Sequence, residues 1–93
     1  MPKEKKAEEK AAGKLISVIQ KEWHEQVGEK AGEETEEIIG KAHYLLQARN
    51  AEKMKLLLGN LSVQQYIGDI WLQKHPNVKP YVKALEHAIN ENA

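Results

Sequence analysis

The sequence predicts an all-α protein, a compact bundle of four to five short helices. Apolar residues recur at helical spacing through most of the chain. Glycine, asparagine, serine or proline separates these periodic segments, and no segment shows the apolar–polar alternation of a strand. Since the connecting segments are short, we expect the helices to pack together as a bundle.

The length and composition indicate one globular unit. Ninety-three residues are enough for one hydrophobic core but not for two. Hydrophobic residues make up 41% of the chain and charged residues 30%, which is typical of a folded domain with a charged surface. We expect a charged, partly disordered lead over residues 1–10 and a single helical domain over residues 11–93. The absence of cysteine excludes a disulfide framework and agrees with a cytoplasmic location.

The first half of the domain is expected to hold two longer helices. The first spans about residues 8–28, and its apolar residues fill about half of the circumference. Because that is more than one neighbour requires, this helix should lie in a groove between two helices or also contact another chain. The second spans about residues 33–49, with glutamates in its first turns and Arg49 at its end, as the helix dipole favours.

A break at Asn50 is expected to separate the second helix from a third one at residues 51–58. The apolar faces of the two segments differ by roughly a third of a turn, so one straight helix would not bury both. Asparagine is a preferred N-cap residue, and Gly59 supplies the stop after the third helix.

The segment from Asn60 to Ile89 predicts two helices joined at His75-Pro76-Asn77. The fourth helix begins at Ser62, which forms a capping-box pattern with Gln65, and ends near His75 because Pro76 disfavours helical geometry before it. The fifth begins after Asn77. The apolar residues that these two helices should bury are Val63, Tyr66, Ile67, Ile70, Trp71, Val78, Tyr81, Val82, Leu85, Ala88 and Ile89.

Residues that carry enzyme chemistry are sparse. No two of the four histidines stand three or four positions apart, and no glutamate stands three positions before a histidine, so we expect no metal and no cofactor. Ser62 is interpreted as a helix cap and Ser17 as a polar surface residue, and no nucleophile elbow or phosphate-binding loop occurs. The run Glu33–Glu37 is interpreted as a solvated first turn. The sequence therefore predicts a protein that is not an enzyme.

Nucleic acid and membranes are the less favoured partners. The alternative to protein binding is a helix-turn-helix protein that inserts the helix after His75-Pro76 into DNA. Its contacts would come from Lys74, Lys79, Lys83, His87 and Asn90. However, the net charge is zero and Arg49 is the only arginine, so little charge is available to neutralise phosphates. No apolar run approaches the ~20 residues that span a bilayer, so no membrane contact is expected.

Apolar residues outside the expected core indicate a protein-binding surface. Tyr44, Leu56 and Leu72 each project away from the apolar face of their helix, and the first helix has a wider apolar face than a small bundle needs. We predict a small, non-enzymatic protein-binding module with a regulatory, inhibitory or adaptor role, of the kind that phages and mobile elements encode. Its partner is another protein or a second copy in a homodimer. The predicted interface residues are Tyr44, Leu56, Leu72, Trp71, Leu15 and Val18.

Overall fold

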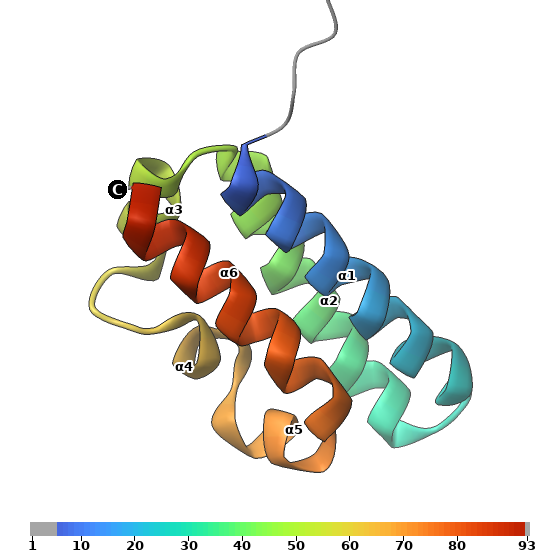
Figure 1. Ribbon diagram of the computed structural model, residues 1–93. Coiled ribbons are helices and arrows are strands. Elements are labelled where there is room, and N and C mark those ends of the chain that lie inside the picture. The colour runs from blue at the N-terminus through green and yellow to red at the C-terminus, as the bar shows by residue number, and fades with distance from the viewer. Residues whose placement is uncertain (1–5, 93) are drawn as a thin grey trace, which may run out of the picture.

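Residues 6–92, the part of the chain that the computed structural model describes, form six α-helices, one 3-10 helix and no strand (Figure 1). This arrangement confirms the predicted all-α bundle. In chain order the elements are α1 (Ala7–Glu25), α2 (Lys30–Ala48), α3 (Ala51–Leu58), α4 (Val63–Ile67), α5 (Asp69–Lys74), η1 (Pro76–Val78) and α6 (Lys79–Asn92). Of the predicted lead, residues 7–10 belong to α1 and residues 1–5 lie outside the described range.

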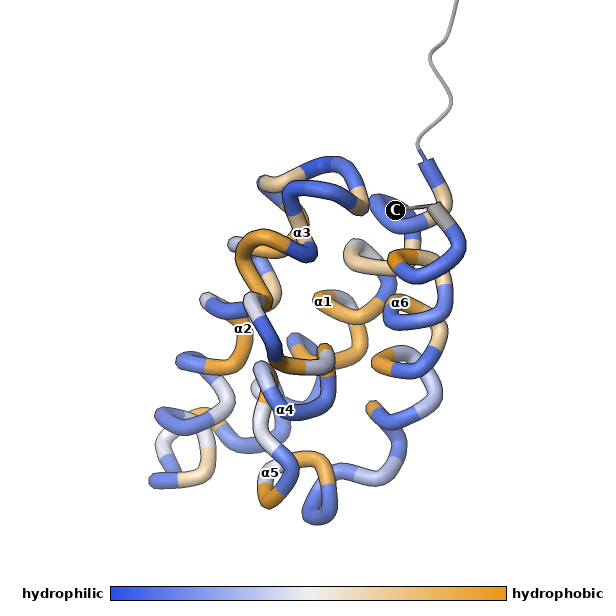
Figure 2. The backbone as a smooth tube through the Cα atoms, turned by 90° about the vertical axis from the view of Figure 1, so that its left-hand side faces the viewer, coloured by the Kyte–Doolittle hydropathy of each residue, from blue (hydrophilic) through white to orange (hydrophobic). Residues whose placement is uncertain are grey.

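Helix α1 packs against both α2 and α6, and this accounts for its wide apolar face. Ala12, Leu15, Ile16 and Ile19 of α1 are buried between these two neighbours. On the side of the bundle away from α1, the short helix α4 contacts α2 and α6 (Figure 2). The long helices therefore form the frame, and α3, α4 and α5 close its open side.

A single hydrophobic core joins all of these elements. Helix α2 contributes Ile38, Ala42 and Leu45, while Met54 from α3 and Ile67 from α4 are almost completely buried. From the C-terminal part, the core receives Trp71, Leu72, Val78, Val82, Leu85 and Ile89. Every described helix thus places apolar residues in the same interior, as expected for a domain of this length.

The predicted break at Asn50 is present. Helix α2 ends at Ala48, and its C-cap residue Arg49 has a left-handed backbone with φ 67°. The Asn50 side chain then accepts a hydrogen bond from the Lys53 amide nitrogen at 2.9 Å, which caps the start of α3. Because the chain changes direction here, α3 is able to bury a face that a continuous helix would have pointed elsewhere.

The prediction of one continuous fourth helix was wrong. The capping box between Ser62 and Gln65 forms as expected, but the chain breaks at Gly68, whose φ of 124° suits glycine. This break rotates the second half of the segment. Leu72, expected outside, is therefore completely buried, whereas Ile70, expected inside, is 69% exposed.

The C-terminal helix buries the predicted residues with one exception. Val78, Val82, Leu85, Ala88 and Ile89 lie in the interior as expected. Tyr81 is exposed instead, because it lies at the edge of α6 beside Val18 of α1 rather than beneath it. The turn that precedes this helix is the 3-10 helix η1, so His75-Pro76-Asn77 is an ordered corner of the bundle.

Candidate functional site

Two leucines at the end of α3, and a third just after it, face outward. Helix α3 buries Ala51, Met54 and Leu58 on one side, and the helical period places the intervening residues on the other. Leu56 is 81% exposed, Leu57 is exposed beside it, and Leu61 is exposed in the segment that follows Gly59. We call Leu56, Leu57 and Leu61 the leucine patch. The hydrophobic stretch at the end of α3 is visible in Figure 2.

Charged side chains lie next to the leucine patch on the same short helix. Lys53 and Lys55 are exposed on α3, and Glu52 is exposed in its first turn. A shallow cavity of about 290 Å³ lies beside this region, where Lys55, Leu58 and Leu61 come close to Glu86 and Ile89 of α6. The patch is therefore an apolar surface with a polar surround, as protein-binding surfaces commonly are.

A pair of tyrosines forms a second surface feature on α2 and α4. Tyr44 of α2 is 61% exposed, and the Lys41 ammonium lies 6.0 Å from the centre of the Tyr66 ring. Burial raises the pKa of Tyr66 above its ordinary value of 10.0, and the nearby Tyr44 phenol raises it further. The two phenol groups are thus close enough to interact electrostatically.

The raised pKa of Tyr66 predicts a loss of stability in alkaline solution. The folded state holds this proton more tightly than the unfolded state, so its contribution to the free energy of unfolding is present below pH 10 and is lost as the pH rises further. We expect Tyr66→Phe to flatten the alkaline decline, measured by denaturant unfolding between about pH 9 and 11. Tyr81→Phe is the matched control. Equal slopes in wild type and Tyr66→Phe would contradict the assignment.

A closed network of hydrogen bonds links the α1–α2 turn to α5. The Trp71 indole Nε1–H donates to Thr35 Oγ1 at 3.1 Å, and the Thr35 hydroxyl donates to Gln26 Oε1 at 2.6 Å. The Gln26 amide Nε2 lies 2.8 Å from His75 Nε2, and His75 Nδ1 lies 2.8 Å from the Trp71 carbonyl oxygen. The His75 and Trp71 rings also stack, with centroids 4.1 Å apart.

The donors and acceptors of this network determine which ring nitrogen of His75 carries the proton. An amide NH₂ can only donate and a carbonyl oxygen can only accept. His75 therefore accepts at Nε2 and carries its proton on Nδ1, as a neutral ring. Thr35 and Trp71 are almost completely buried. Sequence reasoning placed Trp71 among the residues to be buried, and nothing in the spacing of Gln26, Thr35 or His75 indicated that they would join it in a network. The network connects the α1–α2 turn, through Gln26 and Thr35, to Trp71 and His75 at α5.

The predicted interface residues separate into two groups. Tyr44 and Leu56 are exposed, and Val18 is partly buried next to a cavity between α1 and α6. Leu15, Trp71 and Leu72 lie in the core and offer no surface to a partner. Leu15 lies in the groove between α2 and α6, and the Trp71 indole donates a hydrogen bond to Thr35. Leu72 points inward because the chain rotates at Gly68.

The residues of the DNA-binding alternative lie at the end of α5 and along α6. Lys74, Lys83, His87 and Asn90 are exposed, while Lys79 is partly buried. His87 Nε2 lies 3.1 Å from a Glu91 carboxylate oxygen, which places negative charge on the same face. Helix α5 has only six residues, and the 3-10 helix η1 lies between it and α6, so the first helix of a helix-turn-helix pair would be short.

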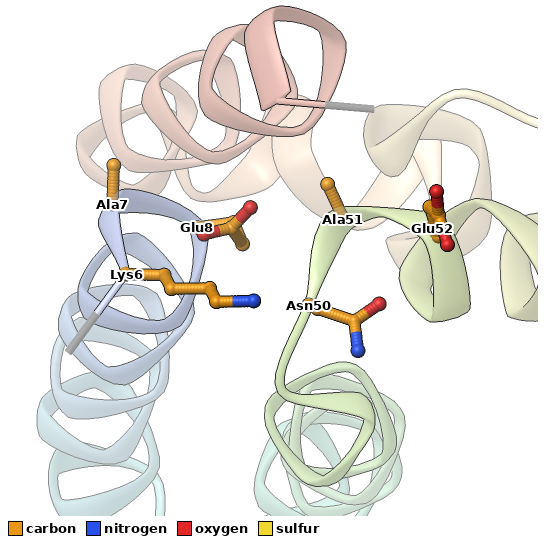
Figure 3. A pocket seen from close by; sticks show the side chains of 6 residues that line it. All are labelled: Lys6, Ala7, Glu8, Asn50, Ala51 and Glu52. Carbon is orange, nitrogen blue, oxygen red and sulfur yellow. The ribbon is translucent and has the colours of Figure 1, made fainter.

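The N-terminal ends of α1 and α3 enclose a cavity of about 530 Å³ (Figure 3). Its lining residues are Lys6, Ala7, Glu8, Asn50, Ala51 and Glu52. Glu8 is only 2% exposed, in the first turn of α1, where the helix dipole favours negative charge. The Asn50 side-chain oxygen Oδ1 already caps α3 by accepting from the Lys53 amide nitrogen. The cavity is therefore lined by charged side chains of both signs and by an amide whose oxygen already has a partner.

Within residues 6–92, no three histidine, aspartate or glutamate side chains are grouped so as to hold a metal ion. In the same range, none of the helices combines the length and apolar character needed to cross a bilayer. Comparison with known proteins gave no match to a family model, to a curated protein or to a solved structure.

Proposed function

We propose that this protein is a small, non-enzymatic binding module that uses the leucine patch to dock on another protein. The observation that carries the proposal is the exposure of three large apolar side chains within six residues of the chain, with Leu56 81% exposed. Burying a leucine side chain that was fully exposed is worth about 1.5–3 kcal/mol. A partner that covers the patch would therefore gain substantial free energy from few contacts.

The position of the patch supports a docking role. Leu56 and Leu57 lie on a helix of eight residues that is capped at its start by Asn50 and held to the core by Met54 and Leu58, and Leu61 follows three residues after its end. The leucines are thus presented from an ordered element, which lowers the entropic cost of binding. A regulatory, inhibitory or adaptor protein acts in this way, by occupying a surface of its partner.

The test is a comparison of binding partners with and without the patch. We expect affinity capture from the native host to recover a partner with the wild-type chain, and its Kd, measured with purified proteins, to rise at least about tenfold for Leu56→Ser/Leu61→Ser. Ile70→Ser is the matched control, because Ile70 is exposed to a similar degree on α5. A partner whose Kd is equal for wild type and both variants would contradict the proposal.

Light scattering distinguishes a second copy from a different partner. If the partner is another copy of the chain, the wild-type mass should double as concentration rises, and Leu56→Ser/Leu61→Ser should stay monomeric. A wild-type mass that remains that of one chain assigns the patch to a different protein.

A further inference from the structure

The cavity between the N-terminal ends of α1 and α3 contains a carboxylate that is buried without a partner. Glu8 is only 2% exposed. Within residues 6–92, no hydrogen bond and no ion pair reaches the Glu8 carboxylate, and the ion pair found in that range joins His87 to Glu91. Burying an ionised carboxylate is costly unless a cation or hydrogen-bond donors compensate it. This carboxylate would therefore gain from binding a cation.

The Glu8 carboxylate faces the cavity rather than the closed interior. In the described part of the chain, every polar side-chain atom that is sealed from solvent has a hydrogen-bond partner. Since the Glu8 oxygens have no partner, they keep the small accessible surface that this residue retains. Figure 3 shows the Glu8 side chain extending from α1 toward the start of α3, into the cavity of about 530 Å³. A volume of this size is typical of small-molecule sites.

The sequence places Glu8 where the fold would otherwise bury an apolar side chain. Helical spacing puts Glu8 on the same face of α1 as Ala12 and Leu15, which lie in the core. The helix dipole favours negative charge in this first turn, but Glu9 stands in the same turn and is less buried. The dipole alone therefore does not require a buried carboxylate, and a residue that breaks the local pattern in this way is typical of functional sites.

The other charged side chains of the lining do not neutralise Glu8. Figure 3 shows the Lys6 side chain extending beside Glu8 toward Asn50, and its ammonium is not within 4.0 Å of any carboxylate of residues 6–92. Glu52 lies across the cavity on α3 and is exposed. Two carboxylates and one ammonium give the lining a net charge of −1, which favours a cationic ligand.

An organic ammonium group fits this carboxylate better than a metal ion does. Among the residues that the structure describes, no three acidic or histidine side chains are grouped so as to hold a metal ion. Ca²⁺ and Mg²⁺ require about six or more oxygen ligands. A primary ammonium group, in contrast, can donate strong hydrogen bonds to the oxygens of a single carboxylate.

The start of α3 supplies donors for an oxygen atom of the same ligand. The amide nitrogens of Ala51 and Glu52 are the first two of this helix and donate to no atom of residues 6–92. The next amide nitrogen, that of Lys53, already donates to the Asn50 side chain. Because Ala51 and Glu52 also line the cavity, a hydroxyl or carboxylate oxygen bound here would accept from unpaired N–H groups.

We propose that this cavity binds a small organic molecule that carries a primary ammonium group and, close to it, an oxygen acceptor. The ammonium group pairs with Glu8, and the oxygen lies at the start of α3. Amino alcohols and free amino acids share this chemistry. The site lies at the beginning of α3, whereas the leucine patch lies at and beyond its end, so the proposal does not depend on docking through the patch.

The experiment uses the full chain and small probes that differ in one group. Ethanolamine and glycine carry the ammonium group, choline replaces its N–H donors with methyl groups, and ethylene glycol has no charge. We expect ethanolamine or glycine to shift the backbone amide resonances of residues 6–8 and 50–52 saturably. The tighter of the two identifies the source as an amino alcohol or an amino acid. Choline and ethylene glycol should bind at least about tenfold more weakly.

Matched variants locate the site at Glu8. Glu8→Gln keeps the shape of the side chain and should weaken binding at least about tenfold. Glu9→Gln removes the same charge from the same turn, but Glu9 does not line this cavity, so binding should change less than about twofold. Ala7→Leu should weaken binding at least about threefold, because the larger side chain occupies part of the cavity.

Circular dichroism of each variant separates lost binding from lost folding, and Ala7→Leu carries the test if Glu8→Gln does not fold. Leu56→Ser/Leu61→Ser should bind the probes as the wild type does, which separates this site from the leucine patch. Absent shifts in the wild type would overturn the proposal. Equal binding of ethanolamine, glycine and choline, equal weakening by Glu8→Gln and Glu9→Gln, or the same shifts from Mg²⁺ would also overturn it.

Discussion

Replacing Gly68 with alanine is expected to lower the free energy of unfolding by about 1–3 kcal/mol, because Gly68 adopts φ 124° between α4 and α5. A side chain at this angle strains the backbone even though space is available, since the nearest atom to an added Cβ would be the Trp71 Cβ at 3.8 Å. In a domain of this size, that loss lowers the melting temperature by roughly 5–20 °C. Thermal and urea unfolding followed by circular dichroism measure both quantities.

Gly40→Ala is the control for this substitution and should have the opposite sign. Gly40 lies inside α2, its φ is not positive, and an added Cβ would meet no atom within 4 Å. Alanine there should raise the free energy of unfolding by about 0.5–1 kcal/mol, because it restricts the unfolded chain and favours the helix. If Gly68→Ala were as stable as wild type, then positive φ would not be what separates α4 from α5.

Thr35→Val is expected to destabilise the fold by about 1–3 kcal/mol, although it preserves the shape of the side chain. The substitution removes the hydroxyl that accepts from Trp71 Nε1–H and donates to Gln26 Oε1. The indole donor then remains buried without a partner, because Trp71 is almost completely buried. Denaturant unfolding gives the free energy, and near-ultraviolet circular dichroism reports whether the Trp71 ring keeps its packing.

Thr35→Ser keeps the hydroxyl and separates hydrogen bonding from packing. We expect it to retain the network and to lose only the buried methyl group, at a cost of about 1 kcal/mol. A Thr35→Val protein at least as stable as the Thr35→Ser protein would show that burial of the methyl groups outweighs the network. In that case the closed set of hydrogen bonds would not be a source of stability.

The sequence predicted those features of the fold that depend on neighbouring residues. The Asn50 break, the Ser62–Gln65 capping box and the inward face of α6 all follow from local hydrogen bonding and helical spacing. Among the predicted interface residues, Tyr44 and Leu56 are exposed, because each projects away from the residues that its helix buries.

The missed features depend on contacts between distant parts of the chain. The break at Gly68 cannot be identified from spacing, because glycine is compatible with a helix interior and its φ is set by how α5 packs on the core. One break reversed the positions of Ile70 and Leu72. The Gln26, Thr35, Trp71 and His75 network joins residues up to 49 positions apart, so no sequence pattern contains it.

The sequence by itself therefore determined the all-α class, the main helices and most of the apolar residues that they bury, because each of these follows from a local period or cap. The tertiary structure decided which apolar residues remain outside. It buried Leu15, Trp71 and Leu72 and left Leu56, Leu57 and Leu61 exposed together. Exposure depends on what packs above each side chain, and only the assembled helices supply that information.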